Sequence, residues 1–339
     1  MACERVSVAP TMQTSVQLPI EGQLPTFEGA SGWLNTAPLT PASLRGHPVL
    51  VEFWTFTCIN WIRTLPYVRT WSERYREDGL IVVGVHTPEF RVERDLKNIR
   101  RAVEAMRIDY PVAVDNDYAI WAAFGNQYWP ALYFADAEGR IRHHHFGEGE
   151  YDRSEIVIQL LLTAAGAGPF SRDLAPIGAD GIEAPADWED LGSPETYLGY
   201  GRAESFASPG GAMRNQRHGY ALPGQLPLNH WGLDGEWTIG REAAVPDGAG
   251  GRIAHRFHAR DLHLVLAPAA GGGPVRFRVE LDGRPPDAAR GSDVDEAGGG
   301  AVTEPRLYQL IRQRAPIEDR TFEITFLDPG ARAYVFTFG

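Results

Sequence analysis

Cysteine is nearly absent from this sequence. Its 339 residues contain only Cys3 and Cys58, and two cysteines are too few for a disulfide framework. Lysine is scarcer still, because Lys97 is the only one and every other basic side chain, histidine aside, is an arginine. We attribute the missing lysines to genome composition rather than to chemistry.

Long apolar stretches are also missing. No segment reaches the ~18 consecutive apolar residues that a membrane-spanning helix requires. Residues 1–25 lack a basic start followed by an apolar core, so they do not resemble a signal peptide. These absences predict a soluble cytoplasmic protein, or an extracytoplasmic one if a leader has been removed.

Positive charge is in deficit. The 32 basic residues face 44 acidic ones, and the net charge of −12 argues against nucleic acid or an anionic membrane surface as a partner. The apolar and aromatic shares, 43% and 11%, are those of a folded soluble protein. A chain of 339 residues is about the right length for two domains.

The first part of the chain, residues 49–166, alternates between strand and helix patterns, as α/β folds do. Short apolar runs predict buried strands, the last two joined as a hairpin by a four-residue turn. Apolar residues at helical spacing predict the helices, and Pro66 lies inside one of them, where a kink is expected. The predicted strands are 49–54, 79–85, 112–114, 131–135 and 140–146, and the predicted helices are 60–77, 92–107, 118–124 and 154–165.

The composition changes after Ala165. Residues 166–194 are rich in Gly, Ala, Pro and Asp without a sustained period, which predicts a linker or an extended crossing segment. From Thr196 onward, short alternating runs separated by glycine-rich spacers predict an all-β sandwich, with no helix apart from a turn at 306–312. The predicted strands there are 254–257, 262–266, 275–281, 322–326 and 334–338.

These patterns predict a two-domain architecture. Residues 1–166 form an α/β domain with a central mixed sheet flanked by helices, and residues 167–195 form the linker. Residues 196–339 form a jelly-roll-like β-sandwich.

Cys58 lies between a predicted buried strand and the start of a predicted helix. There the helix dipole and the free backbone N–H groups stabilise a thiolate, the nucleophilic form of the side chain. Trp61 stands where a Cys-x-x-Cys motif would carry its second cysteine, so the site cannot form the usual internal disulfide. The alternative is a buried and inert free cysteine, a common role for this residue type.

The segments around Cys58 resemble the thioredoxin superfamily, and within it the TlpA-like and redoxin branch. Their amino-acid sequence is similar to that of the extracytoplasmic part of DipZ-type proteins, and this resemblance extends over nearly the whole chain. It implies a thioredoxin-like fold for the first domain and a carbohydrate-binding-module-like second domain. DipZ-type proteins also have membrane helices and a Cys-x-x-Cys motif, and this sequence has neither. The similar segments are FWTFTCIN, RTLPYV, GVHTPEF, YPVAVDNDYAIW, YWPALYF, FGEGEY and SPETYLG.

The resemblance implies roles for residues near Cys58. Glu52 matches a buried acid that serves proton transfer to the second cysteine of the motif, although the alternative here is an acid hydrogen-bonded to water or backbone. Trp129 and Pro130 match the segment of the family's cis-proline, which faces the active cysteine and holds the substrate backbone. We therefore expect Cys58 at a helix N-terminus, Pro130 in cis within contact range of it, and Glu52 buried beneath.

Two further neighbours, Trp61 and His86, have alternative interpretations. Trp61 could shield an oxidised Cys58 or form one wall of a ligand slot, or it could simply pack in the core. His86, just after a predicted strand, could approach Cys58, or it could make a structural hydrogen bond.

Thr55 resembles the threonine of the peroxiredoxin motif, which stands three residues before the cysteine and helps to position the peroxide. Arg63 could be the cation that peroxidase chemistry requires, or a solvated surface residue. The proline that opens that motif is replaced by Val51.

The remaining candidates carry little weight. Three consecutive histidines at 143–145 do not predict a metal site, because adjacent residues on a strand point to opposite faces. Calcium is unsupported, since no EF-hand spacing is present, and no cofactor is predicted. A sugar-binding groove in the second domain is an alternative to core packing, which we favour. The residues that could line it are Trp231, Trp237, His230, Tyr308 and Arg312.

The predicted function is that of a single-cysteine redox protein. Its thiol acts as a nucleophile in thiol–disulfide exchange or peroxide reduction, and a small thiol or thiol protein resolves the product. The alternative is a redox-silent scaffold that binds a peptide or glycan in the groove around the cysteine and on the β domain. A depressed thiol pKa would favour the enzyme, and a normal or raised one the scaffold. The candidate catalytic residues are Cys58, Glu52 and Thr55, and the candidate substrate-binding residues are Trp54, Trp61, Trp129, Pro130 and His86.

Overall fold

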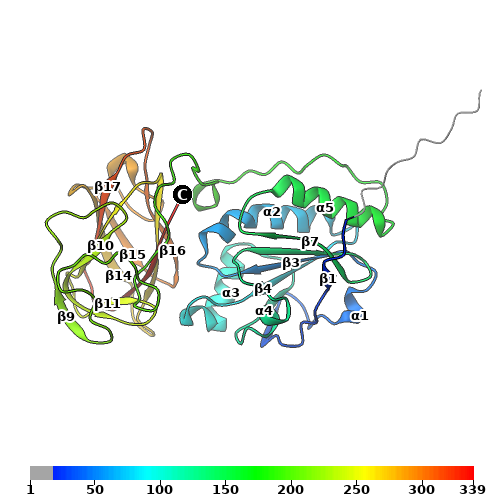
Figure 1. The fold of residues 1–339 in the computed structure, drawn as a ribbon, viewed down its shortest axis with the longest axis horizontal. Coiled ribbons are helices and arrows are strands. Elements are labelled where there is room, and N and C mark those ends of the chain that lie inside the picture. Colours follow the sequence, from blue (N-terminus) through cyan, green and yellow to red (C-terminus); the bar gives the residue numbers. More distant parts are fainter. Residues whose placement is uncertain (1–17) are drawn as a thin grey trace, which may run out of the picture.

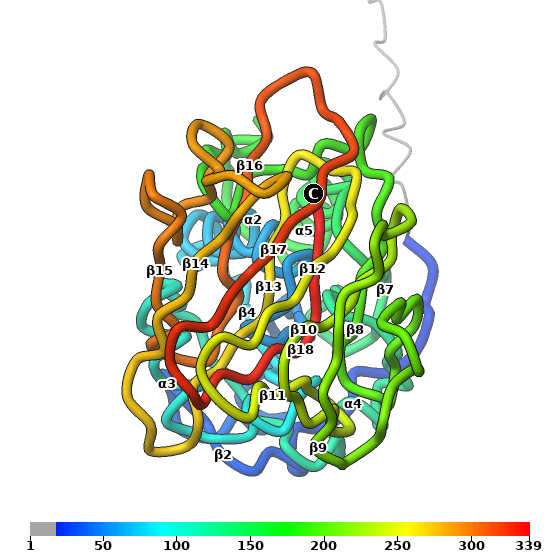
Figure 2. Tube along the Cα trace, turned by 90° about the vertical axis from the view of Figure 1, so that its left-hand side faces the viewer, coloured from blue at the N-terminus to red at the C-terminus, as the bar shows by residue number. Residues whose placement is uncertain are grey.

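The computed structural model describes residues 18–339, and Cys3 lies outside them. The described chain forms two halves, an α/β half and a β-sheet half (Figure 1). Viewed from the side of the β-sheet half, the α/β half lies behind it (Figure 2). Among the described residues, no helix has the length and apolar character needed to cross a membrane.

The α/β half is built on a mixed sheet of seven strands in the order β1-β7-β6-β3-β4-β5-β2. Strands β3, β4 and β5 run parallel, whereas β6 and β7 are antiparallel to their neighbours, which confirms the predicted mixed sheet. The strands are β1 (Gly22–Gln23), β2 (Gly32–Leu34), β3 (Val49–Trp54), β4 (Ile81–His86), β5 (Val112–Val114), β6 (Ala131–Ala135) and β7 (Arg140–Phe146).

Helices cover both faces of this sheet, because alternate residues of its buried strands point to opposite faces. Helices α2, α3 and α5 bury side chains against one face, and α1 and α4 against the other. The helices are α1 (Pro41–Leu44), α2 (Ile59–Tyr75), α3 (Leu96–Ala105), α4 (Ala119–Ala123) and α5 (Tyr151–Ala164).

The helix predicted at 92–107 is interrupted near its start. Residues Arg91–Arg94 form a 3₁₀ turn, η1, and α3 begins only at Leu96. The Asp95 carboxylate accepts a hydrogen bond from the Lys97 N–H at 2.9 Å, so it caps the new helix. This cap gives the backbone a starting point that the periodicity of the apolar residues did not reveal.

After α5 the chain crosses to the second half as an extended segment, as predicted for residues 166–194 (Figure 1). A single 3₁₀ turn, η2 (Gly181–Glu183), lies against α2, and Arg69 forms an ion pair with Glu183 at 2.7 Å. The domain boundaries at 166 and 196 stay predictions.

The second half is all-β, as predicted, with one 3₁₀ turn, η3 (Asp287–Ala289), and all its paired strands are antiparallel. Strand β10 pairs with β11 near its C-terminal end and with β12 near its N-terminal end, so it links two parts of one curled sheet around a second core. The strands are β8 (Thr196–Tyr197), β9 (Arg217–Tyr220), β10 (Trp231–Ile239), β11 (Ala244–Pro246), β12 (Arg252–Phe257), β13 (Asp261–Pro268), β14 (Val275–Leu281), β15 (Gly299–Val302), β16 (Arg306–Arg312), β17 (Arg320–Phe326) and β18 (Ala331–Phe338).

The prediction of a helical turn at 306–312 is wrong, because Arg306–Arg312 is strand β16, paired with β13. Its five central residues are all buried, so no alternation was visible in the sequence. Leu307 packs into the core of the α/β half, whereas Tyr308 packs into the core of the sheet, and a strand covered on both faces looks continuous in hydrophobicity.

The two halves share buried contacts. The main core of the α/β half continues into β13, β16 and β18 through Val265, Leu307 and Tyr334. Arg63 of α2, only 3% exposed, donates hydrogen bonds to Glu148 and to the Phe338 carbonyl, both at 3.0 Å. The C-terminal half is therefore packed directly onto the helix that begins after Cys58.

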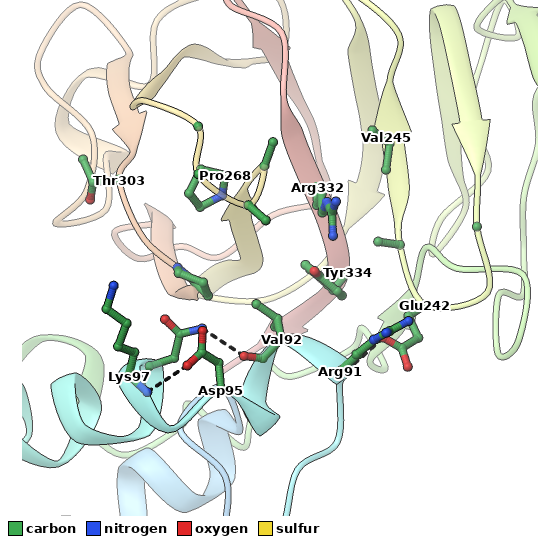
Figure 3. A pocket seen from close by; sticks show the side chains of 18 of the residues that line it. Arg91, Val92, Asp95, Lys97, Glu242, Val245, Pro268, Thr303, Arg332 and Tyr334 are labelled. Carbon is green, nitrogen blue, oxygen red and sulfur yellow. Dashed lines mark hydrogen bonds between the residues drawn. The ribbon is translucent and has the colours of Figure 1, made fainter.

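A cavity of about 790 Å³ opens beside this seam (Figure 3). It lies between the η1–α3 segment and the β-sheet half, and Lys97 and Arg332 line it from opposite sides. The backbone N–H of Arg91 donates to the Glu242 carboxylate at 3.0 Å across the seam. None of the residues that the sequence analysis singled out around Cys58 lines this cavity.

Candidate functional site

Cys58 is the N-cap residue of α2, directly after the loop that follows β3. Its N–H donates to the Thr55 carbonyl at 3.2 Å, and its own carbonyl accepts the Ile62 N–H at 2.9 Å. The Sγ atom lies 3.7 Å from the carbonyl oxygen of Trp129, and the Trp129–Pro130 peptide bond is cis. This geometry is the one expected for Cys58 and Pro130.

Trp61 occupies the position of the missing second cysteine and turns its indole into the core. The indole N–H donates to one oxygen of Glu52 at 3.1 Å, and the Tyr110 hydroxyl donates to the other oxygen. Glu52 is fully buried, as expected. Burial raises the pKa of Glu52 to about 7, although the hydrogen bonds from Tyr110 and Trp61 lower it. The acid therefore has partners for both oxygens, and none of them is a thiol.

The indole rings of Trp54 and Trp61 stack with their centroids 4.4 Å apart, and both side chains are 0% exposed. A side chain without exposed surface offers no face to a ligand in this conformation. Core packing, the simpler alternative for Trp61, is what the structure shows, and a ligand-slot wall formed by the Trp61 indole does not fit it. Trp129, in contrast, is partly exposed and lies on the sulfur side.

The helix N-terminus does not leave the Cys58 thiol with a depressed pKa. Burial raises this pKa well above its ordinary value, and the carboxylates of Glu195 and Glu89 raise it further. The backbone N–H groups of Trp61 and Asn60 act in the opposite direction but are the weaker influence. Although Cys58 itself is partly exposed, the expectation that the helix stabilises a thiolate at neutral pH is not met.

His86 and Thr55 are both fully buried. Among the described residues, neither ring nitrogen of His86 finds a hydrogen-bond partner, so the expected structural hydrogen bond is absent. Burial lowers the pKa of His86 to about 3, and its neutral ring lies parallel to Phe56 at 5.7 Å. The Thr55 hydroxyl also lacks a partner in the described chain, and only the Thr55 carbonyl contacts Cys58, through the backbone.

Arg63 is not the solvated surface residue that we considered. It is buried in the ion pair with Glu148 and in the contact with Phe338, on the seam between the halves. Its guanidinium is committed to these two partners.

Glu93 is a buried acid that the sequence analysis missed. It accepts the Thr57 hydroxyl at 2.5 Å and the backbone N–H groups of Glu89 and Phe90 at 2.6 Å and 2.8 Å. Burial is the main cause that raises its pKa to about 7. Glu93 thus ties the loop before Cys58 to the loop after β4. Its position three residues after Phe90, at the start of a helical segment, was the available signal.

Residues of the second half also reach this site. The Tyr197 hydroxyl lies 2.8 Å from Glu89 and 3.1 Å from Glu195, and Arg202 forms an ion pair with Glu89 at 2.8 Å. Glu195 and Tyr197 belong to the SPETYLG segment, which carried the family resemblance but no expected role at the cysteine.

The other candidates form no site. Within the described part of the chain, no cluster of three His, Cys, Asp or Glu side chains could hold a metal ion, and His144 contacts Glu21 at 2.6 Å. Trp231, Trp237 and Tyr308 are fully buried in the second core, as favoured, and offer no aromatic platform to a sugar. His230 contacts its neighbouring Leu228 carbonyl, and Arg312 binds Asp261.

Comparison with known proteins finds a separate family match in each half of the chain. Residues 20–144 match the AhpC/TSA family, and residues 193–339 match the thioredoxin-like C-terminal domain family. Protein DipZ of Mycobacterium tuberculosis is 36% identical over 282 residues, which are 80% of this chain and 38% of DipZ. This chain therefore spans less than half the length of that relative.

Two shorter proteins match the first half. The thiol-disulfide oxidoreductase YkuV of Bacillus subtilis is 32% identical over 37% of this chain and 83% of its own length. The solution structure of a thioredoxin-like protein in the oxidized form is 32% identical, covers 42% of this chain and 96% of its own, and has a TM-score of 0.38.

Proposed function

Because this chain belongs to the redoxin branch of the thioredoxin superfamily, we propose that it carries out thiol–disulfide exchange with a single sulfur. The observation that carries the proposal is the position of the Cys58 Sγ atom, at the N-terminus of α2 and 3.7 Å from the carbonyl of Trp129, beside Pro130. This arrangement presents one sulfur to a substrate whose backbone lies along the Trp129–Pro130 turn.

The exchange proceeds in two balanced steps. The Cys58 thiolate attacks one sulfur of a disulfide, a mixed disulfide forms, and the other half of the substrate leaves as a thiolate that takes up a proton. An external thiolate then attacks the substrate sulfur of the mixed disulfide, forms a new disulfide with that half of the substrate and releases the Cys58 thiolate. The substrate disulfide is the oxidant and the external thiol is the reductant, so no second cysteine is required.

Two neighbouring residues hold Cys58 and the Trp61 indole in position for this chemistry. Thr55 positions Cys58 through its backbone carbonyl, and Glu52 holds the Trp61 indole in place of serving a second thiol. Peroxide reduction is the weaker branch of the proposal. The Thr55 hydroxyl is buried, and Arg63 is engaged with Glu148 and Phe338.

A redox-silent binding scaffold is the second candidate, and one observation favours it. The raised pKa of Cys58 leaves little thiolate at neutral pH, which slows any attack on a disulfide. In that function the same groove beside Trp129 and Pro130 holds a peptide without covalent chemistry. The cytoplasmic location stays a prediction, which fractionation of the producing cells would test.

The experiment that separates the two functions uses the Cys3→Ser variant, in which Cys58 is the only thiol. The folded protein is incubated with the neutral disulfide of 2-mercaptoethanol, and mass spectrometry measures the mixed disulfide before and after addition of a small thiol. We expect an adduct that the thiol reverses, and none in the Cys3→Ser/Cys58→Ser control. If the denatured protein forms the adduct and the folded protein does not, the scaffold function is correct.

A further inference from the structure

The charged residues beside Cys58 come from both halves of the molecule. Glu89 belongs to the loop after β4, whereas Glu195 ends the linker and Tyr197 and Arg202 follow it. The loop that carries Glu89 lies against Trp129, because the Trp129 indole N–H donates to the Thr87 carbonyl at 3.1 Å. The Trp129 carbonyl in turn lies 3.7 Å from Sγ, so Trp129 connects the loop of Glu89 to the sulfur.

The two carboxylates of this groove are not equally compensated. Glu89 is paired with the Arg202 guanidinium at 2.8 Å, and that guanidinium also lies 3.7 Å over the Tyr197 ring. Tyr197 has one hydroxyl hydrogen and two carboxylate neighbours, so it can donate to only one of them at a time. Glu195 is exposed and forms no ion pair with any cation of the described chain. The two carboxylates therefore share one nearby guanidinium, that of Arg202, and one negative charge is in excess.

The groove has room for a substrate side chain. A cavity of about 350 Å³ lies between the halves, within the size range of small-ligand sites. Trp129 and Tyr118 line it from the α/β half, and Tyr197 and Arg202 line it from the β-sheet half. Cys58 and Glu195 are not lining residues themselves, but each contacts one. The Sγ atom lies 3.7 Å from the carbonyl oxygen of Trp129, and Glu195 lies 3.1 Å from the Tyr197 hydroxyl, so both lie beside this cavity.

We propose that this groove selects disulfides and thiols that carry positive charge, such as aminothiols or cysteine peptides with an adjacent Lys or Arg, and that Glu195 is the residue that selects them. This inference rests on the proposed thiol exchange. A cationic group beside the sulfur is attracted by Glu195, whereas an anionic thiol is repelled. The β-sheet half thereby contributes a specificity residue to a cysteine held by the α/β half.

The test compares three small disulfides on the Cys3→Ser protein: cystamine, which is cationic, the neutral disulfide of 2-mercaptoethanol, and the anionic dithiodiglycolate. Each rate of mixed-disulfide formation is divided by the rate of the same disulfide with a free cysteine peptide, which removes intrinsic reactivity. We expect cystamine to exceed dithiodiglycolate by about fivefold or more at low salt, with the ratio falling at high salt.

Glu195→Gln should bring this ratio close to one. The matched control is Glu296→Gln, which removes the same charge from a side chain that is 85% exposed on the β-sheet half. An equal loss of selectivity in both variants, or no selectivity in the Cys3→Ser protein itself, overturns the assignment of Glu195 while the exchange function stands. Absence of exchange with all three disulfides overturns the exchange function, and this inference with it.

Discussion

The inner and outer surroundings of Cys58 differ in kind. On the inner side, Glu52, Trp61 and Tyr110 are fully buried and hydrogen-bonded to one another. On the outer side, Glu195 and Arg202 are exposed and charged. The family's second thiol is replaced on the inner side by a packed indole, whereas the outer side keeps an open groove. The loss of a resolving cysteine therefore need not close the substrate side of the site.

The largest effect is expected for substitution of Cys58, which lies between the inner and the outer side. Cys58→Ser on the Cys3→Ser background should abolish mixed-disulfide formation completely, because no other sulfur nucleophile remains beside Trp129. The free energy of unfolding should change by about 1 kcal/mol or less, since the substitution alters little volume. Mass spectrometry and urea unfolding measure the two quantities. An adduct that persists in this variant would place the reactive group elsewhere.

Substitutions of Trp61 on the inner side should lower the free energy of unfolding. Trp61→Ala removes a fully buried indole and one donor to Glu52, so the free energy of unfolding should fall by about 3–5 kcal/mol. Trp61→Phe retains most of the packing and loses the hydrogen bond, and it should lose about 1–3 kcal/mol. Chemical denaturation measures both. Equal losses in the two variants would mean that the hydrogen bond to Glu52, not packing, dominates.

Trp61→Cys tests whether the inner side still has the family's backbone geometry. After mild oxidation we expect an internal disulfide between Cys58 and the new cysteine, since both lie in the first turn of α2. The reduced variant should show a loss of stability comparable to that of Trp61→Ala. Mass spectrometry after thiol alkylation detects the disulfide. Failure to form it in a folded variant would contradict a thioredoxin-like arrangement of this turn.

The buried acids of the inner side should make stability depend on pH. The pKa of Glu52 is raised from 4.5 to about 7, so the folded state binds more protons than the unfolded state between these values. The free energy of unfolding should therefore fall as pH rises through this window, by on the order of 3 kcal/mol for this group. Glu93 acts in the same direction.

Urea unfolding of the protein between pH 5 and pH 8 measures this decline. Glu52→Gln stays neutral, so its curve should be flatter than that of the unmodified protein. Parallel curves for the two proteins would show that Glu52 does not titrate in this range.

The smallest expected effect belongs to the outer side. Glu195→Gln should lower the pKa of the Cys58 thiol, because one of the two carboxylates that raise it is removed. Glu296→Gln should leave it unchanged. The rate of alkylation by iodoacetamide as a function of pH reports this pKa in the Cys3→Ser background, and an unshifted titration in Glu195→Gln would remove Glu195 from the surroundings of the sulfur.

Much of the site could be predicted from the sequence, because it depends on features of short segments of the chain. The strand Val49–Trp54, the helix that follows Cys58 and the turn at Pro130 depend on apolar runs, spacing and family resemblance. Strand β16 could not be predicted, because burial on both faces removes the alternation that identifies a strand. The contact of Trp61 with Glu52 was also hidden, since spacing does not state which way an indole turns.

The sequence by itself determined that this chain has one sulfur at a helix start, a tryptophan in the place of the second cysteine, and an α/β half followed by a β half. Only the tertiary structure decided what surrounds the sulfur. Burial and the approach of Glu195 from the β-sheet half raise the thiol pKa against the pull of the helix N-terminus. Desolvation and through-space charge depend on which distant segments pack together, and no local pattern of residues encodes that.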